Sequence, residues 1–228
     1  MDNVSRLTLA HYDQRAEDFW AGTRGHDVRQ NIEALLARIE AVPPFTILDF
    51  GCGPGRDLKA FTALGHVAVG LEGSARFAAM AREYSGCEVL EQDFLSLDLP
   101  AARFAAMARE YSGCEVLEQD FLRLELPAGR FDGIFANAAL FHVPGADLPR
   151  VLGELRAALK PRGVLFSSNP RGNNEEGWNR GRYGAYHDLE TWRTYLTTAG
   201  FAELEHYYRP QGLPRDQQPW LASVWRRR

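Results

Sequence analysis

Glycine occupies three alternate positions, Gly51, Gly53 and Gly55, directly after an apolar stretch that contains Asp49. Glycine adopts positive φ angles without strain and lets a ligand approach the backbone closely. A helical pattern begins near Arg56, and the free amides at the start of a helix point toward such a ligand. Residues 45–58 therefore predict a strand, a tight loop and a helix that together bind a small polar molecule.

The spacing of the glycines separates three kinds of nucleotide-binding loop. A dinucleotide fingerprint needs a third glycine three positions after the second, where this chain has Arg56. A phosphate-binding P-loop needs Gly-Lys-Ser/Thr, which is absent from this stretch. What remains, Asp-x-Gly-x-Gly-x-Gly, resembles motif I of the class I S-adenosylmethionine-dependent methyltransferases. An ordinary glycine-rich turn between a strand and a helix is the alternative.

The resemblance covers about residues 12–225 and implies roles for the loop. An acid placed like Asp49 is expected near the methionyl amino group of S-adenosylmethionine. The backbone that borders this cofactor is expected at Gly51, Cys52, Gly53 and Gly55. Cys52 is expected to pack within the loop and not to act as a nucleophile, because no histidine or acid stands at a recognisable partner spacing.

Glu72 is the second marker of a cofactor site. It ends an expected strand over residues 66–71, about twenty residues beyond the glycine loop. A carboxylate at this place can accept hydrogen bonds from both ribose hydroxyls of an adenosine ligand. We therefore assign Glu72, with the adjoining Gly73, to the cofactor site; the alternative is a solvated acid at a strand end.

Residues 75–101 and 102–128 form a tandem repeat with a period of 27, and they differ only at Ser96/Arg123 and Asp98/Glu125. Such close identity indicates a recent duplication or an artefact, and not a solenoid, whose units diverge and number three or more. Each copy encodes a helix, a short strand and an Asp-Phe pair. A single set of these elements is expected to serve the fold.

The Asp-Phe pair occurs twice, as Asp93-Phe94 and Asp120-Phe121, in identical surroundings. In the family such an acid contacts the adenine amino group, and the next residue packs near the ring. The second copy leads into the following strand through a short loop, so we expect Asp120 and Phe121 to face the cofactor. The 27 residues that the duplication adds, about residues 87–113, are then expected to form an added strand and helix at the sheet edge or a surface bulge. An added edge strand offers a route to a homodimer; a monomer is the alternative.

Residues 131–137 are nearly all apolar, which predicts a strand buried on both faces of a parallel sheet. The segment resembles motif IV of the family, where the backbone at Ala136 and Asn137 borders the methionine end of the cofactor. Residues 138–143 are then expected to line the site of methyl transfer. His142 lies among them and is the expected base for a hydroxyl or thiol acceptor, because its reference pKa is near working pH. A packing or capping role for His142 is the alternative.

The rest of the chain supplies further elements. A Tyr-Asp-x-x-Ala-x-x-Phe pattern at residues 12–19 resembles an N-terminal helix that covers the cofactor, although its aromatic residues could equally dock the helix on the core.

Helices are expected at 147–159, with Asp147 as N-cap, and at 189–199. Strands are expected at 164–168, 201–208 and 220–225. Residues 169–187 are expected to form a long acceptor-binding loop, in which an anionic acceptor could be held by Arg180, Arg182, Tyr183, Tyr186 and His187.

The composition bears on the classes of binding partner and on the cellular location that we expect. The net charge of −4 gives no general attraction to nucleic acid or anionic membranes. The three cysteines form neither an even set nor a C-x-x-C pair, so we expect no metal site and a reduced, cytoplasmic location. Polar residues interrupt each short apolar run near the N-terminus, which argues against a signal peptide or a membrane span.

Strands and helices alternate along the chain, which predicts a doubly wound α/β fold. We expect one methyltransferase domain over residues 1–228, with a helical cap at 1–41. The resemblance implies a Rossmann-like, mostly parallel, seven-stranded sheet with an antiparallel terminal hairpin. The predicted activity is S-adenosylmethionine-dependent methyl transfer to a small-molecule acceptor by in-line displacement. A non-catalytic protein that binds S-adenosylmethionine or S-adenosylhomocysteine is the alternative.

Overall fold

The computed structural model describes residues 2–91 and 126–228. Its helices are α1 (Asp2–Gln14), α2 (Ala16–Thr23), α3 (Arg29–Leu36), α4 (Arg56–Ala63), α5 (Ala75–Ser85), α7 (Leu148–Ala158) and α8 (Leu189–Thr198), with short 3-10 turns η1 (Leu140–His142) and η2 (Arg215–Gln217). Its strands are β1 (Thr46–Phe50), β2 (Val67–Glu72), β3 (Glu88–Glu91), β4 (Phe131–Asn137), β5 (Leu159–Pro170), β6 (Glu175–Asn179), β7 (Arg182–Tyr186), β8 (Phe201–Arg209) and β9 (Trp220–Arg227).

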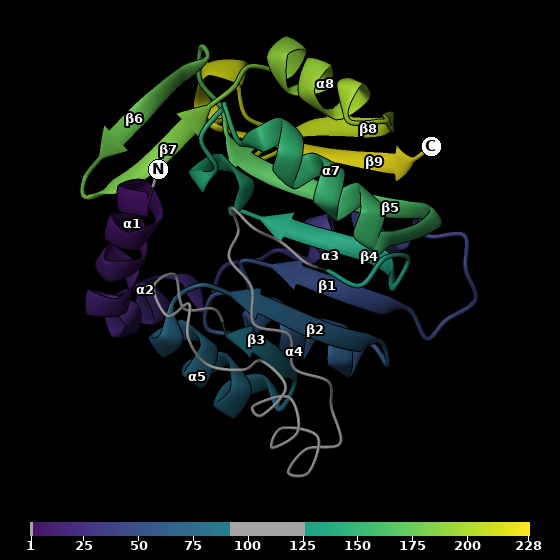
Figure 1. Cartoon of the computed structure of the whole chain (residues 1–228), viewed down its shortest axis with the longest axis horizontal. Helices are drawn as coiled ribbons and strands as arrows, with labels where there is room; N and C mark the ends of the chain where they lie inside the picture. The colour runs from purple at the N-terminus through teal and green to yellow at the C-terminus, as the bar shows by residue number, and fades with distance from the viewer. Residues whose placement is uncertain (1, 92–125) are drawn as a thin grey trace.

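Seven of the described strands form one sheet in the order β3-β2-β1-β4-β5-β9-β8 (Figure 1). β3, β2, β1, β4 and β5 pair in parallel, whereas β9 runs antiparallel to both β5 and β8. The predicted mixed α/β, Rossmann-like fold with an antiparallel terminal pair is therefore confirmed. Asp147 precedes α7 as predicted, but its side chain makes no capping hydrogen bond.

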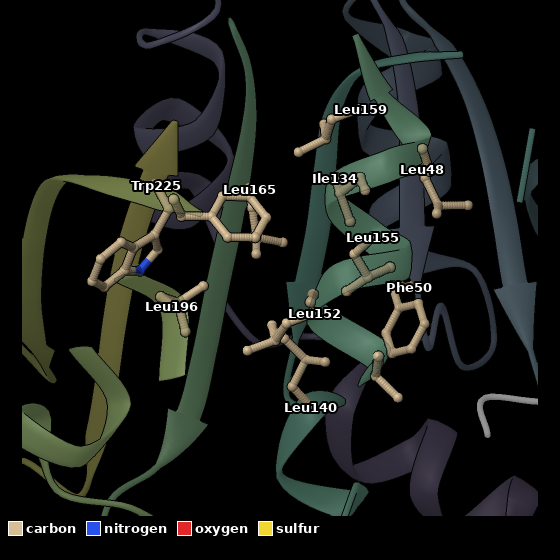
Figure 2. Packing of buried hydrophobic residues seen from close by; sticks show 14 of the residues in the cluster. Leu48, Phe50, Ile134, Leu140, Leu152, Leu155, Leu159, Leu165, Leu196 and Trp225 are labelled. Carbon is tan, nitrogen blue, oxygen red and sulfur yellow. The ribbon is translucent and has the colours of Figure 1, made fainter. Parts of the chain in front are cut away.

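Two apolar layers hold helices on both faces of the sheet, because alternate residues of each strand point to opposite sides. On one face, Leu48, Ile134 and Leu165 pack with Leu152 and Leu155 of α7 and Leu196 of α8 (Figure 2). On the other face, the intervening residues pack with α3, α4 and α5. The carboxyl ends of the parallel strands are thereby fixed along a single edge of the sheet.

The prediction of a long loop at 169–187 is wrong. β5 extends to Pro170, and β6 and β7 then pair as an antiparallel hairpin. The turn residues Arg180 and Gly181 both have positive φ, 50° and 88°, which matches the twist of a two-residue hairpin turn. The hairpin lies beside α1 (Figure 1) and is tied to it by the Tyr183 amide, which donates to the Thr8 hydroxyl over 3.1 Å.

β3 comes from the first copy of the repeat, and it pairs with β2 from Val69↔Glu88 to Glu72↔Glu91. The expectation that the added residues begin at Cys87 is therefore wrong, because the strand that follows α5 in the chain already occupies the place beside β2. The Asp-Phe pairs at 93–94 and 120–121, and the expected extra strand and helix, lie outside the described residues.

Candidate functional site

A cavity of about 790 Å³ lies at the carboxyl edge of the sheet. Its wall includes Phe50 at the end of β1, Glu72 at the end of β2, Asn137 at the end of β4 and Pro170 at the end of β5. α1 contributes Thr8 and other residues of the cover. This is the place where ligands bind in open α/β sheets.

The glycine loop follows β1 directly, and Gly51 and Gly53 line the cavity. Gly51, Gly53 and Gly55 have φ angles of 74°, 51° and 86°, as the sequence predicts for a loop that only glycine adopts without strain. The amides of Gly51 and Cys52 donate to the Leu71 carbonyl over 2.8 and 3.2 Å, which fixes the loop against β2. A Cβ at Gly51 would lie 2.6 Å from Cβ of Ala139, so the loop also touches the segment after β4.

Two glycines of the loop are expected to differ under substitution. A Cβ at Gly55 would meet Cα of Ala81 at 2.8 Å, whereas at Gly53 the nearest atom, Cε1 of Phe19, is 4.0 Å away across open cavity. Gly55→Ala should therefore lower the melting temperature strongly. Gly53→Ala should cost about 1–2 kcal/mol of stability from its left-handed backbone, yet fill space needed by a ligand. Thermal melts and cofactor titration of both variants check this; equal loss of stability in the two would contradict it.

Three buried carboxylates, Asp49, Asp57 and Glu72, surround the loop. Burial, followed by the charge of Asp57, raises the pKa of Asp49 well above its ordinary value, and one Asp49 oxygen, Oδ2, has no hydrogen-bond partner among the described residues. Asp57 forms an ion pair with Arg56 at 2.7 Å. Burial and the neighbouring acids hold the pKa values of Asp49 and Glu72 above their ordinary values, and a cation bound here would offset this repulsion, so this half of the cavity favours a cationic ligand.

Glu72 is held by backbone amides. Oε2 accepts from Gly53 over 2.8 Å and Oε1 accepts from Ser74 over 2.9 Å. Burial nevertheless raises its pKa to about 7. The Ser74 hydroxyl caps α5 and donates to Asp13 of α1 over 2.5 Å, so the N-terminal helix is fastened directly beside Glu72.

Asn137 belongs to a polar chain that the sequence did not reveal. Its Nδ2 donates to Asp57 over 3.3 Å, and its Oδ1 accepts from Asn31 over 3.1 Å. The Asn31 side chain accepts in turn from the Tyr207 hydroxyl over 3.0 Å. Asn31 is fully buried, so a polar residue inside the apolar period of α3 was the signal available.

His142 lies in η1, where both ring nitrogens are engaged. Nδ1 is 2.6 Å from the Tyr183 carbonyl, which can only accept, so Nδ1 carries the proton. Nε2 therefore accepts from the Tyr12 hydroxyl over 2.8 Å, and Arg182 Nη1 donates to the same hydroxyl over 3.0 Å. Burial chiefly, with a contribution from the Arg182 charge, lowers the pKa of His142 to about 4. The imidazole is thus neutral at working pH.

The predicted site residues fall into three groups. Lining the cavity are Gly51, Cys52, Gly53, Glu72, Asn137 and His142. Buried next to that wall without lining it are Asp49, Gly55, Gly73 and Ala136. Asp120 and Phe121 lie outside the described residues. Of the hairpin residues expected to hold an acceptor, Arg182 alone lines this cavity.

Groups that would hold a metal ion are not found in the described ranges, where no three or more His, Cys, Asp or Glu side chains gather suitably. Within residues 2–91 and 126–228, every helix is too short or too polar to span a bilayer.

A family model described as a methyltransferase domain matches residues 20–211. The chain belongs to this methyltransferase family. No curated protein sequence matches it. Among solved structures, the methyltransferase is similar to the 1,6-didemethyltoxoflavin-N1-methyltransferase of Burkholderia thailandensis, whose structure contains 1,6-didemethyltoxoflavin and S-adenosylhomocysteine. The two share 19% identity and a TM-score of 0.69 over 99% of this chain and 88% of the other.

Two further structures have the same fold. The DhpI–S-adenosylhomocysteine complex matches at 18% identity and a TM-score of 0.63, over 98% of this methyltransferase and 97% of that chain. A Haloferax volcanii methyltransferase in complex with the Trm112 activator matches at 18% identity and a TM-score of 0.65, over 96% and 95% of the two chains. At these identities the likeness concerns the fold.

Proposed function

We propose that this methyltransferase transfers the methyl group of S-adenosylmethionine to a small-molecule acceptor. The observation that carries the proposal is the acidic half of the cavity, where a glycine loop adjoins Glu72 and the unpartnered oxygen of Asp49. S-adenosylmethionine is cationic at its sulfonium and amino groups, and its ribose presents two hydroxyls to a carboxylate. The neighbours with bound S-adenosylhomocysteine support this choice.

The residues present fit this cofactor. Glu72 would hold the ribose hydroxyls, Asp49 would face the amino group, and Gly51, Cys52, Gly53, Gly55, Gly73, Ala136 and Asn137 would supply the surrounding backbone. When bound, the cofactor supplies an electrophilic methyl group for in-line displacement. The protein supplies position and a covered cavity, and fixing two reactants in this way lowers a barrier by about 7–11 kcal/mol.

We assign the proton transfer to Tyr12 and His142 together. The neutral Nε2 of His142 already accepts from the Tyr12 hydroxyl, so the acceptor's proton would pass to Tyr12 Oη while the Tyr12 proton moves to Nε2. Its low pKa makes His142 a weak base at rest. Formation of the new bond to the acceptor atom makes the acceptor's O–H, S–H or N–H strongly acidic, which drives the transfer at that moment.

Turnover separates this proposal from a non-catalytic cofactor-binding protein. Donor with a labelled methyl group is incubated with the protein and a panel of small-molecule metabolites. Label in an acceptor product supports the enzyme, whereas cofactor binding without transfer to any acceptor supports the alternative.

The repeat provides two candidate acids for the adenine contact, Asp120 and Asp93, and each serves as the control for the other. We propose that Asp120 and Phe121 make this contact, on the continuity argument from the sequence; because β3 comes from the first copy, Asp93 is the direct rival. Asp120→Ala should weaken S-adenosylhomocysteine binding about tenfold through loss of a hydrogen bond to a charged group, and Asp93→Ala should not. Calorimetric titration of the two variants decides, and the reverse result would move the role to Asp93.

We further propose that residues 1–228 act as a single domain in the reduced cytoplasm, as a monomer or as a homodimer through the duplicated edge. The odd number of cysteines, three, supports a reducing setting over a disulfide framework. The net charge of −4 supports a small-molecule acceptor over nucleic acid.

A further inference from the structure

The cavity has two chemically different halves. The half around the glycine loop contains Asp57 and Glu72, whereas Arg209 at the end of β8 and Trp220 at the start of β9 line a second half. Asp27 is the sole carboxylate among the described lining residues outside the acidic half, and it forms an ion pair with Arg29 at 2.6 Å. A cationic donor in the first half thus leaves a second half that favours an anion.

The far end of this second half is built by three neighbouring strands in register. Pro170 of β5 lies opposite Trp220 of β9, and Trp220 lies opposite Arg209 of β8. Directly opposed residues of paired strands point to the same face of a sheet. All three line the cavity, so they form one continuous platform that ends in a guanidinium group.

Among the described residues, the Trp220 ring has no stacking partner and the Arg209 guanidinium has no carboxylate partner. Trp220 is partly exposed and has no aromatic or cationic ring partner among the described residues. Arg209 Nη2 donates to the Asp27 carbonyl over 2.9 Å, and no carboxylate in the described part lies within ion-pair distance of Arg209. Its charge does help to lower the pKa of Asp27, after the larger effect of Arg29. By contrast Arg193, which packs against the same strand, is paired with Glu203 at 2.7 Å.

The donor's own carboxylate does not account for this platform. The sheet order places β8 three strands from β4, about 14 Å away at the usual strand spacing. The glycine loop follows β1, which is one strand further still. β8, which carries Arg209, is therefore four strands from β1, and the Arg209 guanidinium lies at the Asp27 carbonyl on the cavity wall, outside the acidic half.

We propose that the acceptor is a planar anion, an aromatic or conjugated ring with a carboxylate or similar oxyanion. Its ring stacks on Trp220, its anionic group pairs with Arg209, and its nucleophilic atom points to Tyr12 and His142. Stacking on tryptophan and bidentate pairing with arginine are the strongest recognition modes that these two side chains offer. This inference rests on the proposed methyl-transfer function and gives it a substrate class.

The test uses the full chain saturated with S-adenosylhomocysteine. The probes are one-ring and two-ring hydroxy- and aminoaryl carboxylates, each paired with its methyl ester, and binding is followed by calorimetry. At least one acid should bind about tenfold or more tightly than its ester, because the ester keeps the ring and loses the charge. Esters that bind as well as their acids, or a panel in which no acid binds, would overturn the proposal.

Variants separate recognition of charge from loss of structure. Arg209→Gln should reduce the preference for acid over ester to within about threefold, Arg209→Lys should keep part of it, and Trp220→Leu should weaken acid and ester alike. Arg150→Gln, on the exposed face of α7, should change neither. S-adenosylhomocysteine should bind all of these variants equally. If it binds none of them nor the parent protein, the methyl-transfer function fails; if it binds but Arg209→Gln keeps the full preference, the acceptor class alone fails.

Discussion

Replacing Glu72 by alanine is expected to weaken S-adenosylhomocysteine binding by about ten- to a hundredfold. In the proposed complex the carboxylate accepts from both ribose hydroxyls, and a hydrogen bond to a charged group contributes about 1.5–3 kcal/mol. The substitution also leaves the Gly53 and Ser74 amides without their present acceptor, and these amides shape the loop and the start of α5. Calorimetric titration gives the change in affinity, and a thermal melt shows whether the fold persists.

The pH dependence of binding identifies the same group. Because burial raises the pKa of Glu72 to about 7, this carboxyl is largely protonated below pH 7 in the ligand-free protein, and the proposed ribose contact would displace that proton. The affinity for S-adenosylhomocysteine should therefore rise by about tenfold from pH 6 to pH 8 and flatten above pH 7. In the ligand-free protein the sign is opposite: the free energy of unfolding falls as pH rises from 4.5 to about 7, since the folded state binds the proton more tightly.

Glu83→Ala is the matched control for Glu72→Ala, because Glu83 is an exposed acid on α5. It should leave both the affinity and its pH dependence unchanged. An unchanged affinity in Glu72→Ala, or a pH slope that survives the substitution, would remove Glu72 from the cofactor site.

The second large effect is expected at the Tyr12–His142 pair. His142→Ala should lower kcat by about a hundredfold or more, and Tyr12→Phe should do the same, because each breaks the Tyr12–His142 hydrogen bond through which the proposed proton transfer passes. S-adenosylhomocysteine affinity should change by less than about threefold in either variant, since His142 is hydrogen-bonded to Tyr12 and Tyr183 and not to the acids, and Tyr12→Phe keeps the ring that packs on Phe19 and Phe77. Labelled-methyl turnover and titration on the same preparations give both values.

Tyr84→Phe is the control for Tyr12→Phe, because Tyr84 is exposed on α5 and contacts Trp20 through its ring. It should retain full turnover. If His142→Ala and Tyr12→Phe also retain turnover, the pair serves packing between α1, η1 and the hairpin. A double variant no slower than either single variant is expected, because the two residues act as a unit.

The elements that the sequence predicted best are those with local causes. The strand and glycine loop at 45–58 follow from an apolar run, alternate glycines and a helix start within fourteen residues, and the structure has all three. α7 and α8 were predicted at 147–159 and 189–199, and the structure has them at Leu148–Ala158 and Leu189–Thr198. β6 and β7 were missed, because the Asn, Gly and Arg residues of 169–187 resemble a loop in composition, while the hairpin depends on two positive φ angles at Arg180 and Gly181.

The parts of the site with distant causes could not be predicted. Tyr12 and His142 are 130 positions apart, and nothing local to either residue shows that α1 will place a hydroxyl on the imidazole. The platform of Pro170, Trp220 and Arg209 depends on the register of three strands, which a single sequence does not specify. The repeat was misassigned for a different reason: the two copies differ at only two positions and carry nearly equal local signals, so only pairing with β2 distinguishes them.

We expect the acidic, glycine-lined half of the cavity to bind S-adenosylmethionine. Calorimetric titration of the full chain with S-adenosylmethionine, S-adenosylhomocysteine and NAD tests it most directly. We expect saturable binding of both sulfur ligands to one site, no binding of NAD, and loss of the sulfur ligands in Gly53→Ala while its fold persists. Tight binding of NAD with no response to either sulfur ligand would contradict the account.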